Sequence, residues 1–480
     1  MLNFFKKIAL GQYIMLAIVL LAIRLPLLIK GVPLTIPEVK WLALAHSLQL
    51  GNILYVDVWD ETSPLSALVY WLLFLVFGKN ILAHHILSTI MIYIQALLWN
   101  DILTKRKLYE ERTVLPALLY ITFSTVFFDF IALSPILLAN TFIILALRHI
   151  FLHINENINR SQVFDVGLYL GIATLFFLPS FVLLLIPLVG FLLFTGTKPL
   201  GYFLLLFSFF LPIIVVAVAF FLIDGEYAFL INAMGYLFYG RTLSYFDVQA
   251  GATLLVVPTL LLLTSLVVLF QSNRYINYQV RCQQAMLLTL VVSTLIFLFN
   301  ASFSAHSFVI FLPVFSFFTA HYFLIIKRLL AEALFILFTS LSLTILYATL
   351  WLEVPKAYEH YNTITYDKLI VTVYNEETKQ LIQGKKILVL GNNVSAYYYG
   401  KPATTYLNWQ LAQRHFNALN KFDIQVNILD NFKEDLPQII VDKKDFVPIL
   451  FEAIPALAQY YNKVEGKKMY QLNYMSITEK

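Results

Sequence analysis

The hydropathy of the chain changes abruptly near Trp351, and this change constrains the fold more than any other feature. Before Trp351, apolar runs follow one another and charged residues are sparse, whereas after it charged residues are dense. Of the 480 residues, 60% are hydrophobic and 13% are charged, whereas soluble domains are about 45–50% apolar and about 25% charged. The sequence therefore predicts an α-helical polytopic membrane protein over residues 1–351 and a soluble α/β domain over residues 352–480.

A helix that crosses a bilayer needs about 20 apolar residues, and about eleven runs qualify as transmembrane helices. They lie near residues 8–29, 81–103, 114–128, 132–152, 163–179, 180–196, 200–223, 251–271, 284–300, 307–326 and 331–351. The apolar run from Pro64 to Gly78 would cover only about 22 Å as a helix, which is less than the hydrocarbon core. We therefore predict juxtamembrane helices within a first outer loop over residues 31–78.

Basic residues gather in every second connection between these runs. The predicted cytoplasmic segments carry Lys6, Lys7, Lys105, Arg106, Lys107, Arg112, Arg148, Arg160, Lys198, Arg274, Arg281, Lys327 and Arg328. The opposite loops carry Lys30, Lys40 and Arg241 among several acids. Because Lys and Arg favour the cytoplasmic side, we expect a cytoplasmic N-terminus and an extracytoplasmic tail. The net charge of +5 calls for no nucleic-acid partner.

The tail shows the pattern of a small α/β domain. The pattern predicts strands at Lys385–Gly391, Gln438–Val441 and Lys468–Tyr474. It predicts helices at Thr405–Asn420 and Phe446–Tyr461. The tail contains no glycine-rich phosphate motif and no metal-binding motif. The single cysteine, Cys282, excludes an internal disulfide framework.

The first outer loop carries the residues most suited to chemistry. Glu38 and Lys40 lie on an amphipathic stretch that predicts a helix at the membrane interface, and the segment that follows contains Asp57, Asp60 and Glu61. An ionisable side chain in contact with a membrane costs free energy, so it is usually present only where it serves a function. The segment continues through Pro64-Leu65 and Tyr70-Trp71 to Phe77-Gly78.

This order of residues resembles the first loop of the GT-C superfamily, the multispanning glycosyltransferases that use polyprenyl-phosphate-linked sugars. The resemblance is to the protein-mannosyltransferase and aminoarabinose-transferase branch. It extends to Ser134–Leu147, to Gly167-Leu-Tyr-Leu-Gly171-Ile-Ala173 and to the span that begins His306-Ser-Phe308. It implies a GT-C fold, a polyprenyl-phosphate sugar as donor, and an acceptor lipid, glycan or protein outside a bacterial cytoplasmic (inner) membrane.

The resemblance also implies roles for particular residues. Glu38, Asp57 and Asp60 become candidate catalytic acids or bases, because a carboxylate must orient or deprotonate the attacking group. Lys40, Arg241 and His306 become candidate ligands of the lipid phosphate, because cations stabilise the charge that develops there. Purely structural roles remain open: Glu38 as an acid at a helix N-terminus, Lys40 as a snorkelling side chain, and Arg241 as an interfacial anchor.

The sequence departs from the family pattern at three places. Pro37 stands where the first acid of the loop is expected, Ser134-Pro135 stands where a second acid is expected, and His306 replaces a lysine or arginine. Two other hypotheses therefore stay open beside the glycosyltransferase. One is a non-catalytic GT-C-like protein that binds a partner in envelope assembly, and the other is a transporter. No metal site is predicted from the sequence, and dependence on a divalent metal stays open.

Overall fold

The computed structural model describes residues 2–155, 160–238, 243–245, 248–272, 274–300, 302–351 and 368–473. Internal contacts divide the chain into two compact units, each built from separate stretches of sequence. The first, which we call the helical unit, comprises Met1–Pro33, Ile81–Val216 and Phe246–Thr365. The second, the tail unit, comprises Leu34–Asn80, Ala217–Tyr245 and Tyr366–Lys480, so it joins the predicted first outer loop to the C-terminal tail. The predicted domain boundary at residue 351 stays a prediction.

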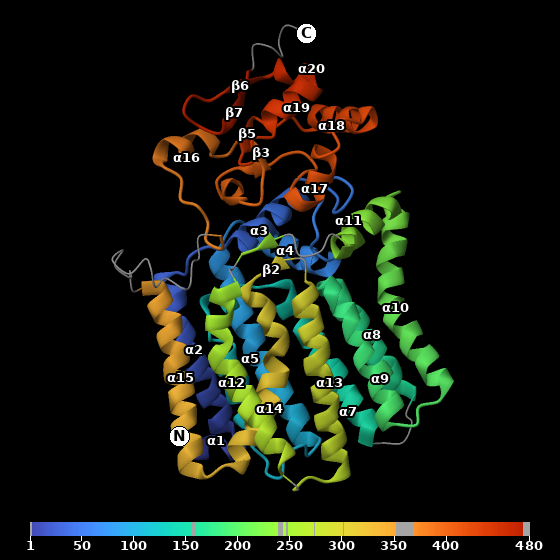
Figure 1. The fold of residues 1–480 in the computed structure, drawn as a ribbon, viewed down its shortest axis with the longest axis vertical. Coiled ribbons are helices and arrows are strands. Elements are labelled where there is room, and N and C mark those ends of the chain that lie inside the picture. The colour runs from blue at the N-terminus through green and yellow to red at the C-terminus, as the bar shows by residue number, and fades with distance from the viewer. Residues whose placement is uncertain are drawn as a thin grey trace. The chain divides into compact units, whose positions relative to one another are not determined.

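The helical unit is a bundle of helices that run side by side (Figure 1). Its elements are α1 (Leu2–Phe5), α2 (Leu10–Lys30), α5 (Ile81–Lys105), α6 (Leu115–Phe123), η1 (Phe128–Ile131), α7 (Pro135–Asn155), α8 (Arg160–Phe176), η2 (Leu178–Leu184), α9 (Leu185–Phe194), α10 (Pro199–Phe221, whose last turn belongs to the tail unit), α12 (Val248–Phe270), α13 (Asn277–Phe299), β2 (Ser302–Phe303), η3 (Ala305–Phe311), α14 (Leu312–Ile325) and α15 (Arg328–Trp351).

Seven helical segments among the described residues are long and apolar enough to cross a membrane. They begin at Leu10, Ile81, Pro135, Pro199, Asn277, Ala305 and Arg328. The polytopic helical class predicted from the sequence is thus confirmed, whereas the number eleven stays a prediction. Some predicted spans are shorter elements here: α6 has nine residues, and Leu178–Phe194 is a short apolar helical stretch.

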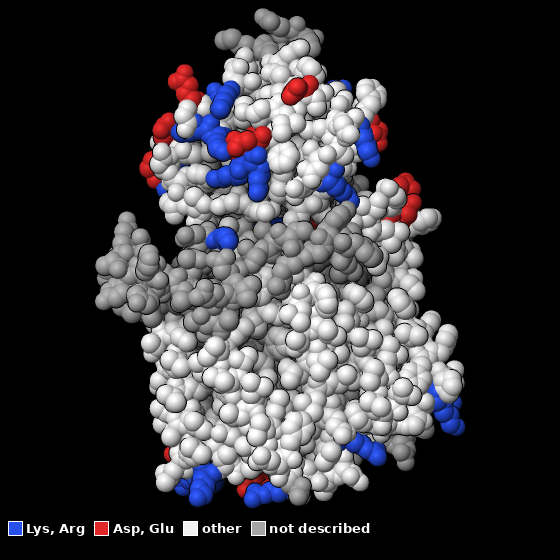
Figure 2. All heavy atoms as spheres, viewed as in Figure 1, with Lys and Arg blue, Asp and Glu red and all other residues white. Residues whose placement is uncertain are grey.

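The surface of the helical unit matches a lipid environment. Figure 2 shows its flank covered by uncharged side chains. Aliphatic and aromatic side chains of α10 point outward, and Phe203 and Val215 are each more than 60% exposed. By contrast, the charged side chains of Lys105, Lys107 and Arg112 are exposed in the connection between α5 and α6. Lipid rather than water is therefore the solvent of this flank.

Two glycines let α8 and α10 approach each other closely. A Cβ atom on Gly167 would lie 2.0 Å from the Ser208 side-chain oxygen and 2.3 Å from the Leu205 carbonyl oxygen. A Cβ on Gly171 would lie 2.3 Å from the Phe209 carbonyl oxygen. Small residues at this spacing are a common device of helix packing in membranes.

The tail unit combines the helices of residues 31–78 with an α/β domain. Its elements are α3 (Ile36–Gln49), α4 (Pro64–Phe77), α11 (Glu226–Phe238), β1 (Leu243–Ser244), α16 (Glu376–Ile382), β3 (Lys386–Leu390), η5 (Ser395–Tyr398), β4 (Lys401–Pro402), α17 (Trp409–Phe416), α18 (Phe422–Glu434), β5 (Ile439–Asp442), α19 (Val447–Ala453), α20 (Pro455–Ala458), β6 (Tyr461–Lys463) and β7 (Met469–Leu472). The α4 helix is short and apolar, as its sequence predicts.

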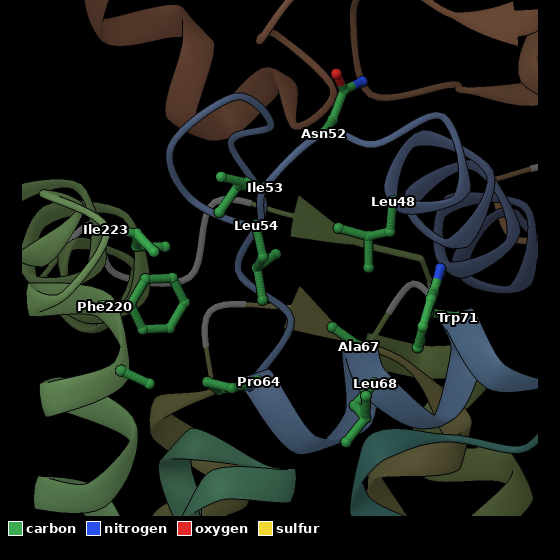
Figure 3. Close-up of a pocket in the computed structure, with 11 residues that line it drawn as sticks. Leu48, Asn52, Ile53, Leu54, Pro64, Ala67, Leu68, Trp71, Phe220 and Ile223 are labelled. Carbon is green, nitrogen blue, oxygen red and sulfur yellow. The ribbon is translucent and has the colours of Figure 1, made fainter.

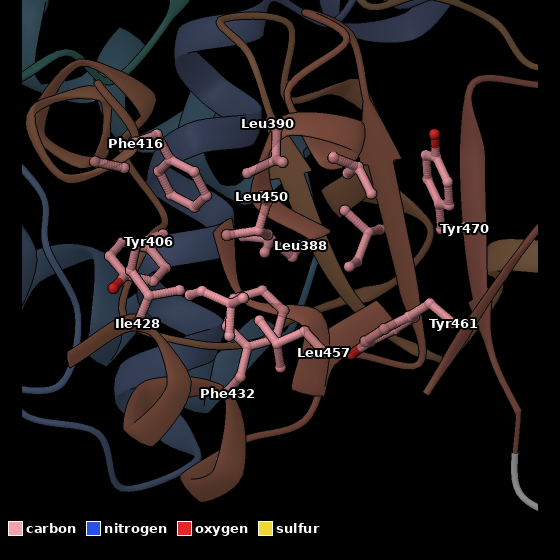
Figure 4. Close-up of a cluster of buried hydrophobic side chains, with 14 of the residues drawn as sticks. Leu388, Leu390, Tyr406, Phe416, Ile428, Phe432, Leu450, Leu457, Tyr461 and Tyr470 are labelled. Atoms are coloured by element: carbon pink, nitrogen blue, oxygen red, sulfur yellow. The ribbon is translucent and has the colours of Figure 1, made fainter. Parts of the chain in front are cut away.

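A five-stranded sheet organises the α/β domain, in the order β4-β3-β5-β7-β6. The β3 strand is parallel to β4 and β5, and β7 is antiparallel to β5 and β6. Figure 4 shows side chains of the sheet, such as Leu388, packed with Phe416 and Phe432 from the covering helices. The three predicted strands are confirmed. The predicted helix Phe446–Tyr461 is wrong in extent, because the chain breaks at Ile454 before Pro455 and enters β6 at Tyr461.

Candidate functional site

The first turn of α3 fixes the position of Glu38. The helix starts after Thr35, and the backbone N–H and the hydroxyl of Thr35 donate to Glu38 Oε2 over 3.0 and 2.9 Å. Glu38 is 3% exposed. A carboxylate at this position satisfies a backbone donor of the helix start and interacts favourably with the helix dipole. Glu38 therefore has a structural task, and its role as a catalytic base stays a prediction.

A strained turn reverses the backbone of the segment that carries Asp57, Asp60 and Glu61. Tyr55 is fully buried and has a φ of 68°, which is uncommon for a bulky residue. Its backbone N–H donates to the Val58 carbonyl over 2.8 Å, and its hydroxyl donates to the Thr62 carbonyl over 2.7 Å. Such a conformation persists only where surrounding contacts hold it.

This turn brings two carboxylates to Lys40. The Lys40 ammonium forms an ion pair with Glu61 and lies 3.5 Å from Asp60 Oδ2. Asp60 is fully buried, and its other oxygen accepts the Thr62 backbone N–H over 2.8 Å. Burial raises the pKa of Glu61, Lys40 lowers it, and the neighbouring Asp60 raises it further, with a net rise. Lys40 and Asp60, predicted separately from the sequence, are thus neighbours.

Tyr70 of α4 adjoins the same charged groups. Its ring stacks on Trp41 with centroids 5.4 Å apart. Burial raises the pKa of Tyr70, and the charges of Glu38 and Asp60 raise it further. We call Glu38, Lys40, Asp60, Glu61 and Tyr70 the loop cluster. Sequence reasoning missed Tyr70 as a cluster member, although its place in the Tyr70-Trp71 pair offered a signal.

Asp57 lies apart from the loop cluster. Its side chain accepts the Ile53 backbone N–H over 2.7 Å in an exposed turn. This bond closes the turn, as an aspartate at such a position commonly does. Its predicted catalytic role stays a prediction.

Residues of α11 and α17 hold the acidic segment from the other side. Asn232 donates to the Tyr55 carbonyl over 2.7 Å, and Arg414 donates to the Asn232 side-chain oxygen over 2.5 Å. The Arg414 guanidinium also lies 4.7 Å from the centre of the Trp59 ring. The backbone of Trp59 donates to Thr405 and accepts from Asn408. The α/β domain is therefore tied to the acidic segment by both side-chain and backbone bonds.

An apolar pocket of about 340 Å³ lies beside the same segment (Figure 3). Its walls come from the end of α3, the start of α4, the turn between them and the last turn of α10. The lining residues are Leu48, Asn52, Ile53, Leu54, Pro64, Ala67, Leu68, Trp71, Ala219, Phe220 and Ile223. Its size reaches the lower range of small-molecule sites, and its walls suit a hydrocarbon chain.

The helical unit holds His306 in a separate polar group. Asp129 on η1 accepts from the Ser304 hydroxyl and the His306 backbone N–H, both over 2.9 Å, and lies 3.1 Å from His306 Nδ1. Burial would raise the pKa of Asp129, but the charge of His306 and these hydrogen bonds lower it below its ordinary value. Sequence reasoning missed Asp129, because the partners are distant in the sequence.

The remaining predicted residue, Arg241, lies outside the described residues. Among the residues that are described, no group of three or more His, Cys, Asp or Glu side chains could hold a metal ion. Dependence on a divalent metal stays open.

Comparison with known proteins defines the class through the fold. No protein-family model matches the sequence. No curated protein matches it either. Among solved structures, the chain shares the fold of ArnT, which is the GT-C fold. The GT-C fold predicted from the sequence is thereby confirmed, and the chain is a multispanning membrane protein of that fold.

The solved structures that the chain resembles include two that are described here by their ligands. One is ArnT from Cupriavidus metallidurans bound to undecaprenyl phosphate, which is 11% identical, with a TM-score of 0.56 over 97% of this chain and 98% of that chain. The other is the archaeal oligosaccharyltransferase AglB from Archaeoglobus fulgidus, in complex with an inhibitory peptide and a dolichol-phosphate. It is 11% identical, with a TM-score of 0.49 over 94% of this chain and 72% of that chain.

Proposed function

We propose that the protein is a membrane glycosyltransferase that moves a sugar from a polyprenyl-phosphate donor to an acceptor outside a bacterial cytoplasmic membrane. The observation that carries the proposal is the match of fold with ArnT along almost the whole of both chains. That relative was solved with undecaprenyl phosphate bound. The buried ionic groups of the loop cluster support the same proposal, since such groups in a membrane protein usually serve function.

The orientation in this proposal follows the distribution of charge along the sequence. Basic residues mark the connections assigned to the cytoplasm, so the first outer loop and the tail face the outside. The apolar pocket of the tail unit supports a lipid partner, because it could take a hydrocarbon chain beside the segment that carries Asp60.

In the proposed reaction, the acceptor attacks the anomeric carbon and the lipid phosphate leaves. Asp60 or Glu38 takes the proton of the acceptor, because both carboxylates are held in place by hydrogen-bond donors or by Lys40. Lys40 balances the two buried acids that adjoin it. Arg241 and His306 are the proposed donors to the phosphate, and Asp57 stays a secondary candidate acid.

The test is donor consumption by the purified full chain. The protein is incubated with polyprenyl-phosphate-linked mannose, glucose or aminoarabinose, together with a membrane lipid extract or a serine-rich peptide, and release of polyprenyl phosphate is measured. Asp60→Asn and Glu38→Gln should lower turnover roughly 100-fold or more if they act as the base, and Arg241→Ala should raise KM. The matched control is Asp101→Asn, which removes a carboxylate whose ion pair with Lys105 is exposed.

Two outcomes would contradict the proposal. Absence of release with every donor would favour the non-catalytic hypothesis, which stable co-purification of a partner would then support. Release that is unchanged in Asp60→Asn, Glu38→Gln and Arg241→Ala would show that the site assignment is wrong. The transporter hypothesis predicts donor movement across vesicles without cleavage.

A further inference from the structure

A second pocket, which is polar, lies in the connection between α5 and α6 of the helical unit. It has a volume of about 320 Å³, in the lower range of small-molecule sites. The lining residues are Leu103, Thr104, Lys107, Tyr109, Glu110, Glu111 and Arg112. None of them belongs to the candidate functional site. The α5 helix is a candidate membrane span that ends at Lys105, so this polar pocket lies where a span ends and water begins.

The α5 helix ends at the pocket with a lysine where glycine is usual. The Leu108 N–H donates to the Leu103 carbonyl, and the Lys107 N–H donates to the Thr104 carbonyl, both over 3.1 Å. These are the two bonds of a Schellman motif, whose left-handed residue is most often glycine. Here that residue is Lys107, with a φ of 51°. A glycine would suit this backbone better, so stability alone does not account for the lysine.

Contacts with two other helices hold the connection in place. Gln279 of α13 donates to the Lys107 carbonyl over 2.9 Å. The Tyr109 hydroxyl donates to the Phe317 carbonyl of α14 over 3.2 Å, and its ring lies 4.4 Å from that of His321 between centroids. The polar pocket is therefore part of the folded helical unit.

The polar pocket is lined by charges of both signs that do not neutralise one another. Lys107 and Arg112 are cationic, Glu110 and Glu111 are anionic, and all four are exposed. Among the described residues, none of the four forms an ion pair, whereas neighbouring Lys105 pairs with Asp101 over 2.9 Å. The cations and the carboxylates thus stand apart around one space. A ligand that carries both charges would form ion pairs with both.

The residue types indicate the chemistry of that ligand. The Arg112 guanidinium and the Lys107 ammonium are donors that recognise phosphate. The carboxylates of Glu110 and Glu111 accept hydrogen bonds from an ammonium group, and the Thr104 hydroxyl adds a neutral donor. With two charges of each sign, the lining matches a group of zero net charge. The headgroups of phospholipids lie at the level where a membrane span ends.

We propose that this polar pocket binds a phosphoethanolamine group, with Lys107 and Arg112 on the phosphate and Glu110 and Glu111 on the ammonium. The proposal goes beyond the proposed function and does not depend on it. The group occurs as the headgroup of phosphatidylethanolamine and in soluble glycerophosphoethanolamine. Both carry the chemistry that the lining recognises.

The test measures lipid binding by the purified full chain in a non-ionic detergent. Dihexanoyl phosphatidylethanolamine is titrated below its critical micelle concentration, and binding is followed by calorimetry. Dihexanoyl phosphatidylglycerol keeps the phosphate without an ammonium, and the phosphatidylcholine keeps the charge without an ammonium N–H. Because charge-assisted hydrogen bonds are lost, both should bind roughly tenfold more weakly than the ethanolamine lipid. This preference should shrink as salt rises, since the four side chains are exposed.

Variants separate the two halves of the polar pocket. Lys107→Gly and Arg112→Gln should each weaken the ethanolamine lipid and the glycerol lipid roughly tenfold. Glu110→Gln combined with Glu111→Gln should weaken the ethanolamine lipid and tighten the glycerol lipid, because the charges that repel its phosphate are gone. A general loss of structure would not act in opposite directions. Since glycine accepts the φ of Lys107, Lys107→Gly should leave the melting temperature unchanged.

The matched control removes the neighbouring ion pair that does not line the polar pocket. Lys105→Gln combined with Asp101→Asn should leave every lipid affinity unchanged. Glycerophosphoethanolamine, titrated in the same way, identifies the source of the group. Binding weaker than that of the lipid would assign the pocket to a lipid headgroup, and equal binding would assign it to a soluble compound. Either result upholds the site.

The proposal is overturned if the wild type binds the three lipids equally, or if the double glutamate variant keeps the preference for ethanolamine. It is also overturned if the control variant loses binding as Lys107→Gly does. No sugar donor enters these titrations, so their failure would leave the proposed function standing. Failure of donor release would likewise leave this site standing.

Discussion

Replacement of Lys40 by methionine is the sharpest test of the loop cluster. The substitution keeps an unbranched side chain of similar length and removes the charge that lies between Asp60 and Glu61. The side chains of Lys40, Asp60 and Glu61 are 10%, 0% and 15% exposed. Removal of one partner from a buried ion pair costs about 3–5 kcal/mol, because a charge is left buried without compensation.

In the variant, protonation of one of the two carboxylates limits the loss of stability, and this limit depends on pH. With the ordinary carboxyl value of 4.5, uptake of one proton costs about 3.4 kcal/mol at pH 7 and about 0.7 kcal/mol at pH 5. In the variant the folded state raises the carboxyl pKa values above those of the unfolded chain. The folded state then binds more protons in that window, so stability falls as pH rises through it. Lys40→Met should therefore destabilise the protein more at pH 7 than at pH 5.

The assay is equilibrium unfolding by denaturant in mixed micelles, followed by tryptophan fluorescence, because Trp41 stacks on Tyr70. Lys105→Met is the matched control, since Lys105 and Asp101 are 68% and 50% exposed and an exposed pair contributes about 0–1 kcal/mol. Glu61→Gln should recover part of the loss in the Lys40→Met background. Equal stability of Lys40→Met and wild type at pH 7, or a loss that does not shrink at pH 5, would refute the reasoning.

Three further predictions address other contacts. Burial, aided by two nearby lysines, lowers the pKa of His46 from 6.5 to about 4, so the folded state binds fewer protons than the unfolded chain in that window. Wild-type stability therefore falls on acidification. His46→Gln should reduce this fall by about 1–3 kcal/mol when the free energy of unfolding is measured at pH 7 and at pH 4.5. Gly167→Ala should destabilise the protein by about 1–3 kcal/mol and lower its melting temperature, because the new Cβ overlaps with α10. In the control Gly196→Ala the new Cβ would meet nothing within 4 Å, so the melting temperature of the protein should stay unchanged. Arg414→Ala or Asn232→Ala should loosen the turn at Tyr55, which faster hydrogen exchange over residues 53–63 would report; unchanged exchange would contradict the clamp.

The class of fold was predictable because its signals are local. Apolar length predicts helices that need lipid, and the strand patterns around Leu388 and Ile440 lie within short continuous stretches. Element limits were less predictable where a single residue decides them. The helix ends before Pro455, although the apolar pattern continues past it. Proline has no backbone N–H to donate to a preceding turn, and apolar periodicity alone does not take this into account.

The candidate site was only partly predictable, because its geometry depends on contacts between distant segments. Lys40 and Asp60 were predictable as candidates because they are ionisable residues of the first outer loop. Their pairing was not predictable, because it depends on the positive φ of Tyr55, which no sequence motif indicates. The same holds for Asp129. The acid expected near the fourth span was sought at Ser134-Pro135, and a buried acid stands five residues before Ser134.

Asp129 also changes what His306 implies. By itself, a histidine in place of a lysine or arginine suggests a weakened phosphate site, since a neutral imidazole carries no charge at pH 7. Here the histidine lies beside a buried carboxylate, with Asp129 Oδ2 3.1 Å from His306 Nδ1. The substitution and the unpredicted acid are therefore best understood together, as a hydrogen-bonded pair in place of a single cationic side chain.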